Sequence, residues 1–252
     1  MAYFKYEGRS IYYEEHGQGQ PVLFLHGNTA SSKMFQYLVP FYQESFRCIL
    51  MDFLGNGRSD RVERFSADLW QEESLQVIGL VERLNCGKVS LVGTSGGAWA
   101  GINAALKRPD LIHKVVADSF DGRTLQDHFA ANVAAERTGA KADPGARRFY
   151  EWCQGPDWEQ VVDLDTEALV RCALENRPLF CGELSELKVP VLLMGSREDE
   201  MCRRGLLEEY EEMAKRIPEA VIHMFERGGH SAIGTNGERA AQVIRDFIGK
   251  GV

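Results

Sequence analysis

The sequence has no long hydrophobic run. None of its apolar stretches approaches the roughly 20 residues that a membrane-spanning helix needs. The first ten residues, MAYFKYEGRS, also lack the charged-then-apolar order of a secretory signal peptide. These two absences predict a cytoplasmic protein without a membrane partner.

The sequence also lacks an excess of positive charge. It has 29 Lys and Arg against 37 Asp and Glu, which gives a formal net charge of −8 at pH 7. A chain with this balance is a poor binder of polyanions, so we expect no nucleic-acid partner.

Paired cysteines are missing as well. Six cysteines are scattered along the chain without a CxxC pair, and no histidine stands at metal-ligand spacing from them. We therefore expect free thiols in a reducing compartment and no bound metal.

What the chain does have is an alternation of short apolar runs and helical segments. Its 252 residues are enough for one large α/β domain. Helical spacing of apolar residues predicts helices at 66–86, with Ser66 as the N-cap, and at 237–248. Most of the strands are apolar throughout, so the predicted fold class is α/β: a mostly parallel, twisted sheet of about eight strands flanked by helices. The expected strands are at residues 3–6, 10–16, 21–25, 46–51, 88–92, 114–117, 189–194 and 221–225.

The segment 120–186 interrupts this alternation. It is rich in Ala, Glu and Arg, and it is far longer than the usual connection between two strands. We interpret it as a helical cap inserted over the carboxyl edge of the sheet. The core domain would then comprise residues 1–119 and 187–252.

Four glycines surround one serine in the stretch LVGTSGGAWAG, residues 91–101. The stretch follows a predicted strand and opens a helix. A serine on such a sharp turn adopts strained backbone angles, and neighbours without side chains let strand and helix approach. The turn exposes the Ser95 Oγ above the sheet edge and aims the Gly96 N–H at an oxyanion formed there. The pattern therefore predicts a nucleophilic serine.

Together with two earlier motifs, this turn resembles the α/β-hydrolase family over nearly the whole chain. HGN at 26–28 and DFLGNG at 52–57 each follow a predicted strand directly. By this resemblance, Asn28 supplies the second oxyanion N–H, and the Asp52 segment is a structural turn without a catalytic role. His26 belongs to the oxyanion loop, which we expect it to orient, and it is a candidate substrate contact.

A serine nucleophile needs a base and, behind the base, a carboxylate. His230 lies in the loop ERGGHSAIG after the last predicted strand, where the family keeps its histidine in the order Ser, acid, His. The acid is expected in GSREDE after the strand at 189–194, where three acidic residues stand in a row. We favour Asp199. Glu198, at the other common spacing, and Asp118, at a position that some family members use, are the alternatives.

The resemblance implies acyl transfer to water without a metal or organic cofactor. Ser95 attacks a carbonyl while His230 moves the proton. The N–H groups of Gly96 and Asn28 hold the oxyanion. The expected partner is a small-molecule substrate, a small apolar ester or thioester, and Trp99 is a candidate for lining its pocket.

Two alternative functions stay open at this point. One is hydrolysis of a carbon–carbon bond in a diketone, and the other is a small-molecule receptor with slow residual hydrolysis. Haloalkane dehalogenases and epoxide hydrolases of this family carry Asp at the position of Ser95, which argues against both of those activities. No feature of the sequence specifies an oligomeric state.

Overall fold

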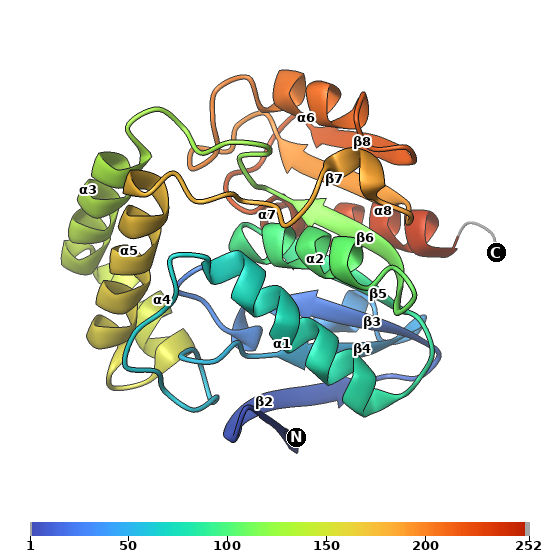
Figure 1. Cartoon of the computed structure of the whole chain (residues 1–252), viewed down its shortest axis with the longest axis horizontal. Helices are drawn as coiled ribbons and strands as arrows, with labels where there is room; N and C mark the ends of the chain where they lie inside the picture. The colour runs from blue at the N-terminus through green and yellow to red at the C-terminus, as the bar shows by residue number, and fades with distance from the viewer. Residues whose placement is uncertain (1, 250–252) are drawn as a thin grey trace.

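The structure, a computed structural model, describes residues 2–249. Its centre is an eight-stranded sheet with the strand order β1-β2-β4-β3-β5-β6-β7-β8 (Figure 1). The strands are β1 (Ala2–Tyr6), β2 (Arg9–His16), β3 (Gln20–Leu25), β4 (Phe46–Met51), β5 (Val89–Thr94), β6 (Ile112–Asp118), β7 (Val191–Ser196) and β8 (Ala220–Phe225).

The antiparallel part of the sheet is confined to its N-terminal edge. β1 pairs antiparallel with β2, and β2 pairs antiparallel with β4. From β4 to β8 every described pairing is parallel. The turn between β1 and β2 has positive φ at Glu7 (49°) and Gly8 (82°), as a tight hairpin requires. The sheet is mixed but mostly parallel, which confirms the predicted fold class.

Helices cover both faces of the sheet. Leu23 and Leu25 of β3 belong to a core shared with α1 and α2. Val22 and Phe24 belong to the opposite core, which contains residues of α8. Side chains alternate between the two faces of a strand, so a strand covered on both faces is apolar at every position. The helices of these layers are α1 (Leu69–Leu84), α2 (Gly96–Lys107), α6 (Leu206–Ala214), α7 (Ala232–Thr235) and α8 (Gly237–Gly249).

Three further helices lie between β6 and β7 along the chain: α3 (Phe129–Ala142), α4 (Pro144–Gln154) and α5 (Trp158–Leu174). They stand together beside the sheet, at the left of Figure 1, and they fall within the segment expected to form a cap. Asp143 starts α4, because its carboxylate accepts hydrogen bonds from the N–H groups of Gly145 and Ala146. Of the helices in residues 2–249, none combines the length and the apolarity needed to cross a membrane.

The start of α1 differs from the sequence prediction. The helix begins at Leu69 with Asp68 as its N-cap, so the prediction of Ser66 as N-cap is wrong. The Ser66 hydroxyl instead accepts a hydrogen bond from the Asp68 N–H at 3.1 Å. Serine bonds to nearby backbone in turns as readily as at helix caps, so a serine before a helical segment does not by itself fix the first residue of the helix.

Candidate active site

Ser95 stands on the turn between β5 and α2 in a backbone conformation that side chains rarely adopt. Its φ is 54° and its ψ is −124°. The turn is held on both sides, because the Ser95 N–H donates to the Asp118 carbonyl at 2.8 Å and the Ser95 carbonyl accepts from the Ala98 N–H at 3.0 Å. A Cβ on Gly93 would lie 2.1 Å from the Gly97 carbonyl oxygen. The flanking glycines are therefore required for the strand and helix to meet at this serine.

Gly96 makes room for the loop that follows β3. A Cβ on Gly96 would lie 2.2 Å from Asn28 Oδ1 and 2.7 Å from Trp70 Nε1. The Trp70 indole N–H donates a hydrogen bond to Asn28 Oδ1 at 3.1 Å. The structure thus brings Gly96 and Asn28, the two residues expected to supply oxyanion donors, to the same place.

The Asn28 side chain is held at both ends. While its oxygen accepts from Trp70 on α1, its Nδ2 donates to Asp165 Oδ2 at 2.7 Å. Asp165 lies on α5 and is only 2% exposed. Burial raises the pKa of Asp165. The loop that carries Asn28 is therefore tied to a helix of the sheet layer and to a helix of the cap segment.

His230 pairs with one of the three acids that the sequence offered. Its Nδ1 lies 3.1 Å and 3.0 Å from the two carboxylate oxygens of Asp199. A carboxylate only accepts, so Nδ1 carries the proton and Nε2 is left free to act as a base. Glu198 is exposed and accepts instead from the Gly228 N–H. Asp118 accepts from the Thr94 hydroxyl and the Ile233 N–H.

The charges around this pair fit a base held by an anion. Burial alone would raise the pKa of Asp199, but the hydrogen bond and charge of His230 and two backbone N–H groups lower it. Burial alone would lower the pKa of His230, but the hydrogen bond and charge of Asp199 outweigh burial and raise it above 6.5. Burial raises the pKa of Asp118 to about 7. Asp199 is thus the carboxylate of the site that its partners keep ionised.

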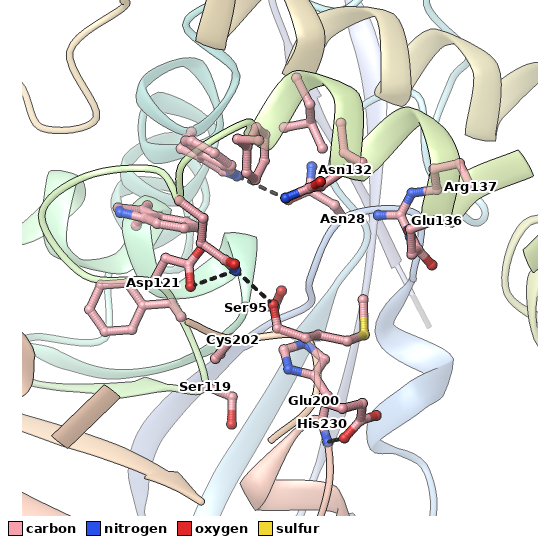
Figure 2. A pocket seen from close by; sticks show the side chains of 18 residues that line it. Asn28, Ser95, Ser119, Asp121, Asn132, Glu136, Arg137, Glu200, Cys202 and His230 are labelled. Atoms are coloured by element: carbon pink, nitrogen blue, oxygen red, sulfur yellow. Dashed lines mark hydrogen bonds and ion pairs between the residues drawn. The ribbon is translucent and has the colours of Figure 1, made fainter. Parts of the chain in front are cut away.

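Two cavities meet at Ser95 and His230. The first has a volume of about 300 Å³, and Figure 2 shows both side chains at its wall. The second has a volume of about 540 Å³, and both residues line it as well. Residues of α3 line both cavities. The first is also lined by Trp70, Trp99 and Phe120, and the second by residues of α4. A molecule with a reactive carbonyl at this junction would place one half in each cavity.

The structure does not support the expectation that His26 contacts a substrate. His26 is 2% exposed and lines neither cavity. Its Nδ1–H donates to the Gly27 carbonyl at 2.8 Å, and its Nε2 accepts from the Phe53 N–H at 3.1 Å. Burial lowers the pKa of His26, which favours the neutral ring that this pair of bonds requires. The residue instead links the loop that carries Asn28 to the backbone of Phe53.

Trp99 has both a packing role and a place in the cavity wall. Its ring stacks on Trp70 with the ring centroids 4.2 Å apart, and its Nε1–H donates to the Gly122 carbonyl at 2.9 Å. It is 5% exposed and lines the first cavity. The sequence prediction of Trp99 at the pocket agrees with this placement.

Three residues of the site were missed from the sequence. Trp70 lies on α1, Arg137 on α3 and Asp165 on α5, and all three reach the surroundings of Ser95 or Asn28. No local pattern marks them, because each is one polar or aromatic residue within an ordinary helix. Arg137 and Asp165 stand out only once the structure shows that these two charged side chains are buried.

One set of side chains in the described part of the chain could hold a metal ion. Potential ligand atoms of Asp199, Cys202 and His230 lie within 4.8 Å of one another. Asp199 and His230 already hydrogen-bond each other. Burial raises the pKa of the Cys202 thiol well above its usual range, so without a bound cation this side chain carries its proton.

Comparison with known proteins places the chain in one family. The sequence profile of the Alpha/beta hydrolase family matches residues 22–245. Over 138 residues the chain is 37% identical to 2-(acetamidomethylene)succinate hydrolase from Mesorhizobium japonicum, an alignment that covers 54% of this chain and 46% of that relative. The chain therefore matches less than half the length of this curated relative.

Two further similarities extend over nearly the whole chain. Cis-3-alkyl-4-alkyloxetan-2-one decarboxylase from Shewanella oneidensis is 28% identical over 96% of this chain and 86% of its own length. The solved structure of the esterase EaEST from Exiguobacterium antarcticum superposes with a TM-score of 0.75 at 22% identity, covering 97% of both chains. At that identity the structural similarity shows a shared fold.

Proposed function

Because the chain belongs to the alpha/beta hydrolase family, we propose that it is a serine hydrolase of small esters or thioesters. One observation carries this proposal: His230 is paired with Asp199 at a cavity junction whose wall also holds Ser95. A histidine oriented by a buried carboxylate is the arrangement that activates a serine hydroxyl.

In the proposed reaction, the Ser95 Oγ attacks the substrate carbonyl and its proton passes to His230 Nε2. Asp199 stabilises the imidazolium that forms. The N–H groups of Gly96 and Asn28 donate to the tetrahedral oxyanion, and each such donor typically lowers the barrier by about 3–4 kcal/mol. The imidazolium then protonates the leaving group, and a water molecule repeats the sequence on the acyl-enzyme. These steps require no metal and no organic cofactor.

The two cavities favour a small substrate with apolar parts on either side of the carbonyl. Trp70, Trp99 and Phe120 line the first cavity, and Met34 and Phe149 line the second. Volumes of about 300 Å³ and 540 Å³ accommodate short chains or single rings. Activity on an acyl compound is also what the name of the hydrolase relative describes for that protein.

A fluorophosphonate probe tests the proposal, because it reacts with activated serines. We expect one adduct per chain by intact mass, on Ser95 by peptide mapping, and its loss in Ser95→Ala and His230→Ala. Ser119→Ala is the matched control, since Ser119 lines the same cavity while its hydroxyl accepts from the Ala232 N–H. A folded protein that forms no adduct, or that is labelled on Ser119, would contradict the proposal.

A further inference from the structure

Arg137 occupies a position where an apolar residue is the rule. It is the one residue of α3 that is buried, with a side chain that is 10% exposed. Charged side chains are rarely buried to this extent unless their charge and hydrogen-bonding groups are matched. The contacts of Arg137 therefore show whether it serves the fold alone.

Only some N–H groups of the Arg137 guanidinium have a hydrogen-bond partner. Its Nη1 lies 2.9 Å from the carboxylate of Glu136 and donates to the Tyr150 hydroxyl at a long 3.3 Å. Its Nε is buried and has no hydrogen-bond partner among residues 2–249. Asp165 contributes an attractive charge, but within the same residues it forms no ion pair with Arg137, and its Oδ2 is taken by Asn28. An unpartnered buried Nε is not peculiar to Arg137, because Arg58, Arg171 and Arg203 each have one as well. Of these four arginines, only Arg137 lines the cavities at Ser95.

The Arg137 side chain lies at the cavities that Ser95 and His230 line. Arg137 lines both cavities, as do Ser95 and His230. Figure 2 shows the Arg137 side chain extending from α3 toward Asn28, above the first cavity. Glu136 and Tyr150 engage Nη1, and Nε is closed off from solvent, so Nη2 is the guanidinium nitrogen left for a ligand in the cavity.

We propose that Arg137 binds a carboxylate of the substrate, so that the substrates are small acyl compounds carrying a free carboxylate besides the scissile carbonyl. A carboxylate accepts a charge-assisted hydrogen bond from such an N–H group, and bonds of this kind are about twice as strong as those between neutral groups. This inference rests on the proposed function and narrows its substrate class.

The first cavity also contains acidic side chains, which would favour a cationic substrate over a carboxylate. Three acids also line that cavity: Asp121, Glu136 and Glu200. Glu136 lines the second cavity as well and is paired with Arg137. Of the other two, Asp121 accepts from the Arg203 N–H at 2.8 Å and Glu200 accepts from the His230 N–H at 3.2 Å, so backbone engages both. If these acids and not Arg137 controlled selection, the enzyme would prefer a substrate with an ammonium group.

Three p-nitrophenyl esters that differ only at the end of the acyl chain separate these cases. They are the monoester of glutaric acid, the valerate ester and the 5-aminovalerate ester. We expect kcat/KM for the glutarate ester to exceed that for valerate by about 10- to 100-fold, the range of one charge-assisted hydrogen-bonded pair. The 5-aminovalerate ester should be the poorest of the three. Equal rates, or a preference for the ammonium ester, would overturn the inference.

Variants assign the preference to Arg137. Arg137→Gln should remove the glutarate-to-valerate preference, mainly through KM, and Arg137→Lys should keep part of it. Arg148→Gln is the matched control, because Arg148 is an exposed arginine on the neighbouring helix α4. Fluorophosphonate labelling of each variant shows whether its site is still folded. An Arg137→Gln variant that labels normally and keeps the preference would contradict the role of Arg137.

A binding measurement keeps this inference distinct from the proposed function. Glutarate itself is titrated into Ser95→Ala by calorimetry, with and without Arg137→Gln. Binding that is lost on adding Arg137→Gln supports the carboxylate site even if no ester is hydrolysed. Absence of glutarate binding in a folded Ser95→Ala protein would refute the carboxylate site, while leaving Ser95 labelling as the separate test of hydrolase chemistry.

Discussion

Replacing Gly96 by alanine should damage catalysis more than stability, because of where the added methyl group would lie. The new Cβ would be 2.2 Å from Asn28 Oδ1, and ordinary van der Waals contact begins near 3.4 Å. Asn28 must therefore retreat by roughly 1 Å, since backbone on either side of the turn cannot. This movement breaks the hydrogen bond from Trp70, whose indole N–H is buried.

The expected losses of stability and of kcat follow from two hydrogen bonds: the one from Trp70 to Asn28, and the proposed one from the Asn28 N–H to the oxyanion. Leaving the Trp70 N–H unsatisfied costs about 1–3 kcal/mol of the free energy of unfolding. At about 2–4 °C per kcal/mol for a chain of this size, Tm should fall by several degrees. Asn28 also carries a proposed oxyanion donor, and loss of one such donor typically lowers kcat by about 10²- to 10³-fold.

A second glycine on the same helix is the control. A Cβ on Gly101 would meet its nearest neighbours at 3.5 Å to 3.8 Å, which is ordinary contact. Gly101→Ala should therefore leave kcat unchanged and raise stability by about 0.5–1 kcal/mol, because alanine favours a helix. Both variants are compared by ester turnover and thermal unfolding. If Gly96→Ala kept the kcat of Gly101→Ala, the assignment of Asn28 and Gly96 to oxyanion binding would be refuted.

Three further predictions test the charged part of the site. Asp199→Asn should lower kcat by about 10³- to 10⁴-fold, because an amide at this position favours the wrong tautomer of His230. Glu198→Gln should stay near the parent rate. If ester turnover showed the reverse order, Glu198 and not Asp199 would be the acid. Since the base must be neutral and Asp199 raises the pKa of His230, kcat/KM should fall as pH decreases through a pKa above 6.5. A pH profile should show that limb move to lower pH in Asp199→Asn, and an unmoved limb would contradict the pairing. Asp165→Ala leaves the Asn28 amide without its acceptor, so kcat should fall about 10-fold with a smaller change in KM; an effect on KM alone would instead assign Asp165 to substrate binding.

The local sequence was enough to predict the strand–turn–helix at Ser95 and the succession of strands and helices along the chain. A buried strand, a run of glycines and a helix start are features of neighbouring residues, so the short-range sterics at Ser95 are visible in the stretch LVGTSGGAWAG. The run from Val22 to Leu25 in β3 is apolar at every position because both faces of that strand are covered. The hydrophobic pattern therefore sufficed for the fold class.

The choice of the acid required the tertiary structure. Glu198, Asp199 and Glu200 are adjacent, and the direction of each side chain depends on how the loop after β7 packs beside the loop after β8. Asp199 faces His230, which is 31 residues away, because its carboxylate also accepts from the N–H groups of Met201 and Cys202. No periodicity of a single segment encodes that orientation.

The same limit applies to the residues that surround the reacting groups. Asn28 meets Asp165 across 137 residues of sequence, and Arg137 reaches the two cavities from a helix whose other residues are not buried. His26 was expected at the substrate because it adjoins the oxyanion loop, but its ring turns inward to bond the backbone of Phe53. The sequence by itself determined the fold and the chemistry-bearing turn through short-range sterics and hydrophobic patterning. Only the tertiary structure decided which polar side chains face the cavities, because that depends on packing between segments far apart in the chain.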